Sequence, residues 1–252
     1  MERSQPPVIF SRRKAAAKWA RGRSRSSDAD AATYLSDTVT DDVIERLEFM
    51  RHEPGSALVV GDGSGRLAKW LKRRGTAVVR RDLGRFDEEQ PGEPDRFDLV
   101  VHLMGLGHVN DLPGALIHAR NSLAPGGVFI AAFPGAGSLA TLRRIALAAD
   151  GDRPSPRMHP LVDEQAGASL LQRAGFTRQV VDSFPVDVRF GSLRRLVEDL
   201  RDHGLTRSLA SPAPPVTRRW LARAEDVFEA ERDAQGKVPE RFEILVLTAW
   251  KV

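Results

Sequence analysis

The sequence predicts an α/β fold built on a doubly wound, mostly parallel sheet, and two observations carry that prediction. Short apolar segments alternate along the chain with longer segments in which apolar residues recur at helical spacing. One apolar segment, Ala57–Val60, runs directly into three glycines separated by single residues, Gly61, Gly63 and Gly65, and a helical pattern begins near Arg66. Such a turn between strand and helix is typical of parallel sheets that bind ligands at the carboxyl ends of their strands.

Helices and strands can be predicted in order along the first half of the chain. A helix is predicted over 41–51, where apolar residues have helical spacing, and it ends at Glu53-Pro54-Gly55. The helix after the glycine turn ends at Arg73-Arg74-Gly75, because cations and a glycine favour a helix C-terminus. A short strand is predicted over 77–79. The next strand, over 97–101, is almost continuously apolar, as buried parallel strands are.

The second half continues the same alternation. Helices are predicted over 111–123, 138–149, 163–174, 192–202 and 218–231, and strands over 128–133, 180–184, 186–190 and 242–250. The last two helices belong to a lid insertion over about 191–235, which we expect to cover the ligand-binding edge of the sheet and to set substrate choice. We therefore expect one domain over 28–252, preceded by a basic arm over 1–27.

Composition limits the class of protein. The chain has 252 residues, 41% of them hydrophobic, and no long uncharged apolar stretch of the kind that spans a membrane or directs secretion. It has no cysteine, which excludes disulfides, thiolate nucleophiles and cysteine-ligated metal sites. The absence of cysteine agrees with a reducing compartment. We expect a cytoplasmic bacterial protein, with the mitochondrial matrix as the alternative.

Positive charge is concentrated at the N-terminus. Residues 1–27 contain eight Lys and Arg and one acid, a net charge of +7, whereas the whole chain carries +4, so residues 28–252 sum to −3. We therefore expect no specific nucleic acid partner for the body of the protein. The arm has the composition of a mitochondrial transit peptide. The alternative, which we favour, is a flexible or helical extension, or a segment that contacts anionic lipid at a membrane periphery or a partner protein.

Seven segments and a short N-terminal motif form a set that runs through most of the chain. They are Asp87-Glu88-Glu89, Val109–Gly114, Leu123–Gly127, Ser155-Pro156-Arg157, Leu170–Phe176, Asp199-Leu200-Arg201 and Phe242–Trp250, with Ile9-Phe10-Ser11-Arg12 before them. This set resembles the methyltransferase-like assembly-factor family of respiratory complex I, within the class I S-adenosylmethionine-dependent methyltransferase superfamily. The resemblance implies a Rossmann-like methyltransferase sheet. The mitochondrial member of that family is an arginine hydroxylase acting on a complex I subunit, and wider relatives include the malonyl-carrier-protein methyltransferase of biotin synthesis.

The glycine turn is the predicted cofactor site. Gly61, Gly63 and Gly65 let a ligand approach the backbone amides, and the following helix offers unpaired N–H groups to a carboxylate or phosphate. The alternative is a tight turn that binds nothing. The resemblance implies that the ligand is S-adenosylmethionine, with Asp82 on the ribose and Asp87 near the adenine edge. An ordinary turn acid is the alternative role for Asp82.

The chain departs from the family pattern at three places, so its cofactor motif is degenerate. Methyltransferases of this class usually carry an acid two residues before the first glycine, where it holds the cofactor's amino group. This chain has Val59 there, which accepts no hydrogen bond. Asp62 in the turn is a candidate substitute, with a solvent-exposed turn acid as the alternative. The segment from Arg80 to Phe97 is shorter than usual, so we expect the sheet to lack one edge strand. Leu106-Gly107-His108 replaces the relatives' Leu-His-Trp.

Methyl transfer requires little acid–base chemistry, because the sulfonium already activates the methyl group. His108, in the loop after the third strand, is the predicted base, with an exposed loop histidine as the alternative. Arg157 is predicted to pair with a carboxylate of cofactor or substrate, with a structural salt bridge as the alternative. Asn110 and Asp111 are expected to cap the next helix. The histidines are scattered along the sequence, so we expect no metal site.

Two classes of function follow from these residues. The first is an enzyme, a methyltransferase with an unknown substrate and an expected protein client, or an arginine hydroxylase of the family type. The second is a non-catalytic binding or complex I assembly factor that keeps the fold and has lost the cofactor. The glycines and Asp82 favour an enzyme, whereas Val59 and the shortened segment favour the second class. Hydroxylation enters only through the resemblance, since the residues themselves supply no mechanism for it.

Overall fold

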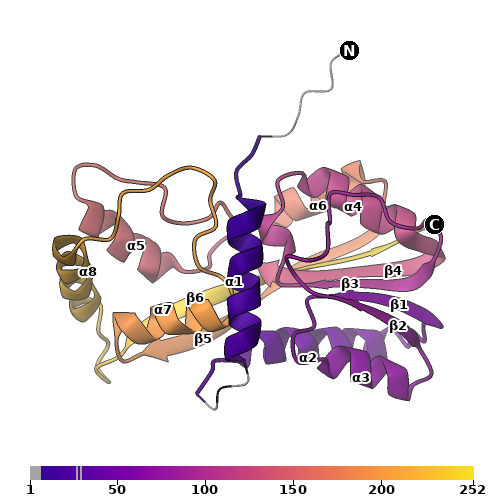
Figure 1. Cartoon of the computed structure of the whole chain (residues 1–252). Coiled ribbons are helices and arrows are strands. Elements are labelled where there is room, and N and C mark those ends of the chain that lie inside the picture. Colours follow the sequence, from indigo (N-terminus) through magenta and orange to yellow (C-terminus); the bar gives the residue numbers. More distant parts are fainter. Residues whose placement is uncertain (1–6, 27, 29) are drawn as a thin grey trace.

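A six-stranded sheet lies at the centre of the computed structural model, which describes residues 7–26, 28 and 30–252 (Figure 1). The strand order is β2-β1-β3-β4-β6-β5. The strands are β1 (Ser56–Val60), β2 (Ala77–Arg81), β3 (Phe97–Leu103), β4 (Leu123–Pro134), β5 (Arg178–Phe190) and β6 (Val238–Trp250). The first four run parallel, and β6 is antiparallel to both of its neighbours. The predicted doubly wound, mostly parallel α/β sheet is confirmed.

Helices cover both faces of this sheet. One face carries α2 (Tyr34–Phe49) and α3 (Arg66–Arg73), and the other carries α4 (Leu112–Ser122) and α6 (Glu164–Arg173) (Figure 1). At one end, α8 (Arg218–Ala230) packs on α5 (Ala140–Asp150), and α7 (Leu193–Asp202) contacts β5. The inner strands β1 and β3 thus have apolar contacts on both sides, which is why they are mostly apolar and buried, whereas β2 at the edge carries two arginines.

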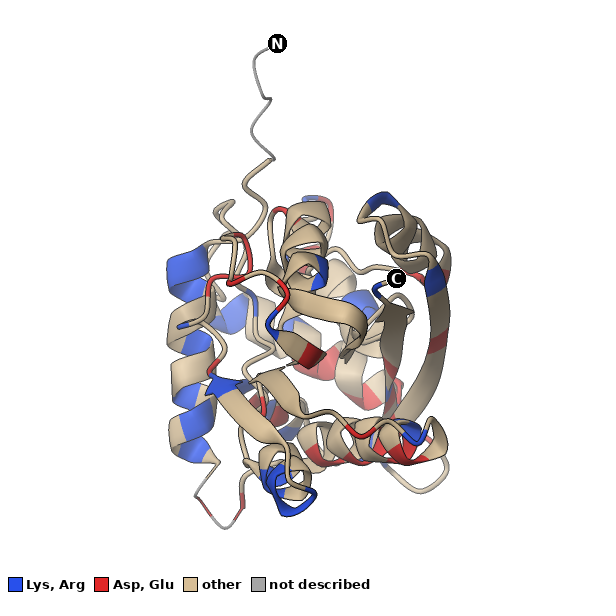
Figure 2. Cartoon of the chain, turned by 90° about the vertical axis from the view of Figure 1, so that its right-hand side faces the viewer, with Lys and Arg blue, Asp and Glu red and all other residues tan. Residues whose placement is uncertain are grey.

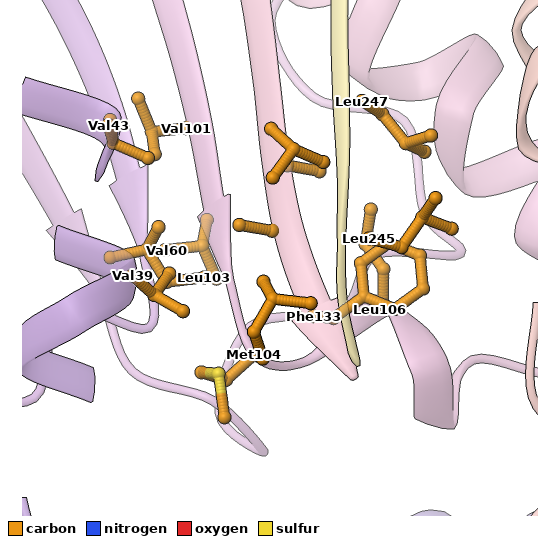
Figure 3. Packing of buried hydrophobic residues seen from close by; sticks show 14 of the residues in the cluster. Val39, Val43, Val60, Val101, Leu103, Met104, Leu106, Phe133, Leu245 and Leu247 are labelled. Carbon is orange, nitrogen blue, oxygen red and sulfur yellow. The ribbon is translucent and has the colours of Figure 1, made fainter. Parts of the chain in front are cut away.

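The core joins helix and sheet through regularly spaced apolar residues. Leu35, Val39, Val43 and Leu47 of α2 are all buried and recur every fourth residue, so they form one face of that helix. Figure 3 shows Val39 and Val43 lying against the side chain of Val60 and its neighbours on β3. The same spacing extends N-terminal to the predicted start at 41, which explains why α2 begins at Tyr34.

Two predicted features of the sheet have clear outcomes. Residues 82–96, between β2 and β3, contain turns and irregular structure and no strand, so β2 is an edge strand. The described chain has no further strand beyond β2, as the short segment from Arg80 to Phe97 predicts. The two strands expected over 180–184 and 186–190 are one strand, β5, which continues through Pro185. β5 is the other edge of the sheet, where a proline is tolerated because its missing N–H need not serve a second neighbour.

Most of the basic arm forms helix α1 (Arg12–Arg25), which packs against α7. Ala15, Trp19 and Gly22 are its buried residues, and their spacing places them on one face. Lys and Arg occupy much of the remainder and appear as a blue stripe along the helix in Figure 2. Residues 1–6 and 27 of the arm lie outside the described part of the chain.

Glycines on three segments let the backbone of α1 approach its neighbours closely. A Cβ on Gly22 would lie 2.7 Å from the carbonyl oxygen of Asp202, and one on Gly84 would lie 2.5 Å from the Cα of Ala16. A Cβ on Gly204 would lie 2.3 Å from an atom of the Trp19 ring. These distances are too short for any larger residue, so the docking of α1 depends on small residues in both the arm and the body.

Candidate functional site

A cavity of about 160 Å³ lies where β1, β2 and β3 end. The glycine turn after β1, the loop after β2 and Met104 after β3 form its floor, and α1, the start of α2 and the end of α7 form its walls. Its lining residues include Gly61, Gly63, Asp82, Trp19, Arg23 and Asp37. The carboxyl edge of a parallel sheet is the place where this class of fold binds ligands. We call this space the glycine-turn cavity.

The three glycines of the turn have different structural reasons to be small. Gly61 has a φ of 86°, and a Cβ there would lie 2.2 Å from the carbonyl oxygen of Leu103. Gly65 has a φ of 72°, and a Cβ there would lie 3.0 Å from Arg80 Nη1. Gly63 has neither constraint, since nothing lies within 4 Å of its Cβ position. The described fold accounts for the first two glycines, whereas Gly63 is exposed and borders the cavity without such a constraint.

The predicted cofactor acids occupy different places. Asp82 lines the glycine-turn cavity, and its carboxylate is only loosely paired, 3.9 Å from Arg23 and 3.8 Å from Arg85. Asp87 lies outside that cavity and forms a 2.5 Å ion pair with Arg12 of α1. The two acids therefore occupy separate positions. Asp82 keeps hydrogen-bonding capacity for a ligand, whereas Asp87 is occupied in holding the arm.

Asp62 has a structural task inside the turn. Its Oδ2 accepts a hydrogen bond from the backbone N–H of Ala68, at 2.9 Å, and the residue is 3% exposed. It is therefore not a solvent-exposed turn acid, and that alternative is wrong. Its Oδ1 is buried without a partner in the described structure. A role for Asp62 as a substitute for the acid missing at Val59 stays a prediction, and Val59 itself is buried in the core.

Two polar residues of the same cavity were missed in the sequence. Asp37 on α2 reaches it with a carboxylate that lies 3.6 Å from Arg66. His203, which follows α7, is 8% exposed, and its buried Nε2 has no hydrogen-bond partner within the described chain. Burial lowers its pKa to about 4, so the ring is neutral at neutral pH. No local sequence signal marks these residues, because they come from helices that only the tertiary fold brings to the glycine turn.

These groups match the chemical needs of the cofactor that the resemblance implies. The carboxylates of Asp82 and Asp37 are acceptors for ribose hydroxyls and for an ammonium group, respectively. A side chain at Gly63 would extend into empty space that a ligand can fill. The buried Nε2 of His203, which has no partner among the described residues, is a further polar group at the cavity. The residues present therefore fit S-adenosylmethionine, even though the motif acid is replaced by Val59.

A second cavity, of about 150 Å³, lies beside the first, and Met104 lines both. Met104 has a φ of 66°, a conformation that is uncommon for a residue other than glycine. Its backbone N–H donates a 2.7 Å hydrogen bond to the carbonyl of Ala132, which holds this strained residue at the end of β3. The other walls come from β4, α5, the loop over 157–161, and the end of α7 with residues 205–207. We call this space the arginine cavity.

His108 lines the arginine cavity at the centre of an aromatic cluster. Its ring centroid lies 5.6 Å from that of Phe10, 5.3 Å from that of Trp19 and 4.5 Å from that of His159. Both ring nitrogens are buried without a partner among the described residues, so the alternative of an exposed loop histidine is wrong. Burial, reinforced by His159, lowers the pKa of His108 to about 3. The ring is therefore neutral at neutral pH, and its role as a base stays a prediction.

Arg157 lines the same cavity. It forms a structural salt bridge, which was the predicted alternative to pairing with a ligand. Its Nε lies 2.7 Å from Asp150 Oδ1, and its guanidinium lies 4.5 Å from the centroid of the Trp220 ring. Burial opposes ionisation of Asp150, but hydrogen bonds from Arg157, Trp220 and Ser155 outweigh burial and lower the pKa of that carboxyl. The charge of Arg157 is therefore compensated, and its pairing with a ligand stays a prediction.

Other predicted features around the site are structural. Asp111 accepts a hydrogen bond from Gly114 N and so caps α4, as expected. Asn110 instead accepts from the backbone N–H groups of Ile9 and Phe10, at 2.8 Å each, and fixes the start of the arm. Of the expected lid, α7 and residues 205–207 reach the cavities, while α8 packs on α5.

No group of three or more His, Asp or Glu in the described ranges is arranged to hold a metal ion. No helix within the described part of the chain is both long and apolar enough to cross a membrane.

Comparisons with known proteins agree with this geometry. Residues 32–181 match the family model described as a methyltransferase domain. The mouse protein "arginine-hydroxylase NDUFAF5, mitochondrial" is 28% identical over 250 residues, covering 90% of this chain and 73% of its own length. The malonyl-[acyl-carrier protein] O-methyltransferase of Halorhodospira halophila is 29% identical over 262 residues, covering 90% and 86%.

Solved structures support the same fold. The YcgJ protein from Bacillus subtilis has a TM-score of 0.53 at 10% identity, covering 84% of this chain and 97% of its own. A 1,6-didemethyltoxoflavin-N1-methyltransferase from Burkholderia thailandensis has a TM-score of 0.50 at 17% identity, covering 96% and 87%. At these identities the likeness shows the fold alone. Since the family model spans more than half of the residues, the chain belongs to the methyltransferase-domain family and has the fold of S-adenosylmethionine-dependent methyltransferases.

Proposed function

We propose that this protein binds S-adenosylmethionine in the glycine-turn cavity and transfers its methyl group to an acceptor in the arginine cavity. The observation that carries this proposal is Gly63. Its two neighbours in the motif are small because the backbone requires it, but Gly63 has no such reason and borders the cavity. A glycine that the fold does not require, at the carboxyl edge of a parallel sheet, is what a ligand-binding turn needs.

Different residues bind the cofactor and position the acceptor. Asp82 accepts hydrogen bonds from the ribose, and Asp37 balances the ammonium group in place of the acid absent at Val59. When bound, the cofactor supplies an electrophilic methyl group. Met104 lies between the two cavities and positions the acceptor against that group, while α1 with Trp19 covers the site and excludes water.

Isothermal titration calorimetry with S-adenosylmethionine tests the proposal on the full chain. The wild type is expected to bind, and Gly63→Arg is expected to lose binding because its side chain fills the cavity. Gly191→Arg is the matched control, since a Cβ at Gly191 also meets nothing within 4 Å but lies away from the cavity. Absence of heat and of any thermal shift with the wild type at millimolar ligand would overturn the proposal.

A non-catalytic binding or assembly role is the second candidate. It is favoured by the buried Val59 and by α1, which lies over the glycine-turn cavity with Arg12 paired to Asp87 and Arg25 paired to Asp202. The client would be a protein, and the resemblance points to a complex I subunit in a bacterial cytoplasm or a mitochondrial matrix. Deletion of the protein should then lower the abundance of assembled complex I. Normal abundance in the deletion strain would exclude this role.

A further inference from the structure

We infer that the arginine cavity selects an acceptor with an apolar body and a negatively charged end, and that it rejects a guanidinium group. The inference deepens the proposed function and rests on it in one respect, that this cavity is the acceptor site. The charge and the apolar lining of the cavity are properties of the chain alone. They can therefore be tested without the cofactor.

The walls of the cavity are mostly apolar. Met104, Leu139, Leu142, Met158, Leu161 and Leu200 are among its lining residues. Long side chains such as those of methionine and leucine adapt to a flexible aliphatic group, and such contacts favour an apolar occupant through burial of its surface. The body of the acceptor is therefore hydrocarbon-like, with room for a chain of several carbons.

The charge around the cavity is positive and not fully compensated. Arg143, Arg157 and Arg207 line it, and no Asp or Glu of the described residues does. Arg157 is neutralised by Asp150. Arg207 donates to the carbonyl oxygens of Pro156 and Ser211, which satisfy its N–H groups but carry no negative charge.

Arg143 is the free cation of this set. It lies on α5 and is half-buried, and its guanidinium forms no ion pair or hydrogen bond with any described residue. A guanidinium held in an apolar wall binds an oxyanion through charge-assisted hydrogen bonds. It repels a second guanidinium, and the cavity offers no carboxylate to offset that repulsion.

The neighbouring titratable groups respond to the same field. Burial, together with the nearby charges of Arg207 and Lys18, lowers the pKa of His159 to about 4. Burial and the nearby Arg157 also lower the pKa of Arg207. The Nε2 of His159 accepts a 2.7 Å hydrogen bond from Ser208 N, which fixes that ring as neutral. These shifts agree in sign with a positive potential at the cavity, which favours an anionic occupant.

Three probes with hydrocarbon chains of similar length and different end groups test the inference: hexanoate, 1-hexanol and hexylguanidinium. Each is titrated by calorimetry into the full chain without cofactor. We expect hexanoate to bind about 10-fold or more tightly than 1-hexanol, and hexylguanidinium not to bind in the same range. Arg143→Gln should remove the preference for hexanoate and leave binding of 1-hexanol unchanged. Arg144→Gln is the matched control, because Arg144 is paired with Glu231 and does not line the cavity.

Methionine methyl NMR locates the probes. The chain has four methionines, of which Met104 and Met158 line the arginine cavity and Met50 ends α2. Hexanoate should shift the signals of Met104 and Met158 and leave that of Met50 in place. Failure of every probe to bind, equal binding of hexylguanidinium, or a preference for hexanoate that survives Arg143→Gln would overturn the inference. If the probes behave as expected but S-adenosylmethionine does not bind the wild type, the proposed function fails and the anion site remains.

Discussion

The packing of α1 against the rest of the protein can be tested by adding one methyl group at Gly204, which faces Trp19 of α1. Gly204 has a φ of 70°, and a Cβ there would lie 2.3 Å and 2.7 Å from two carbons of the Trp19 ring. Gly204→Ala therefore carries two costs. The left-handed backbone costs a residue with a Cβ about 1–2 kcal/mol, and the overlap with the indole adds about 1–3 kcal/mol, as overpacking does.

Gly236→Ala separates these costs. Gly236 has nearly the same φ, 71°, but its Cβ would meet nothing within 4 Å, so this variant carries the backbone cost alone. The difference between the two variants in the free energy of unfolding, measured in urea, is expected to be about 1–3 kcal/mol. That difference isolates the close approach of Trp19 to residue 204.

Limited trypsin digestion distinguishes local undocking of α1 from global unfolding. The helix carries several exposed Lys and Arg residues, and cleavage there follows the population in which α1 is undocked. Cleavage within α1 should rise about 5- to 140-fold in Gly204→Ala relative to Gly236→Ala, the range that corresponds to the energy difference. Equal unfolding energies and equal cleavage rates for the two variants would refute the packing of α1 described here.

Three further predictions concern single side chains. Asp82→Ala should weaken binding of S-adenosylmethionine about 10- to 150-fold, the loss expected for a hydrogen bond to a charged group, as measured by calorimetry. Asp150→Ala should destabilise the protein by about 3–5 kcal/mol in urea because it leaves Arg157 largely buried without its charged partner, whereas Asp187→Ala, at an exposed pair, should leave the urea midpoint almost unchanged. The buried His108 has its pKa lowered to about 3 from 6.5, so below pH 6.5 the unfolded chain takes up its proton first and stability falls. His108→Phe should therefore reduce the slope of unfolding free energy against pH by about 1.4 kcal/mol per pH unit between pH 6 and 4, and an unchanged slope would contradict the burial of this ring.

Local patterns were enough for much of the fold. The helix start near Arg66 and the cap at Asp111 were predicted correctly, because each depends on residues within about one turn. The shortened segment from Arg80 to Phe97 also indicated the missing edge strand. The strand through Pro185 was predicted as two, because its position at the sheet edge is a property of the whole sheet.

Some features of the candidate site could likewise be predicted from the sequence, and others could not. The sequence by itself determined the alternation of strands and helices, the glycine turn and the absence of the usual acid at Val59, since these are properties of consecutive residues. Only the tertiary structure distinguished Gly63 from the other two glycines and brought Asp37 and His203 to the turn. It also placed Arg143 in an apolar wall without a carboxylate. The physical reason is that the charge and steric space around a side chain are set by segments far away in the sequence, which no local periodicity encodes.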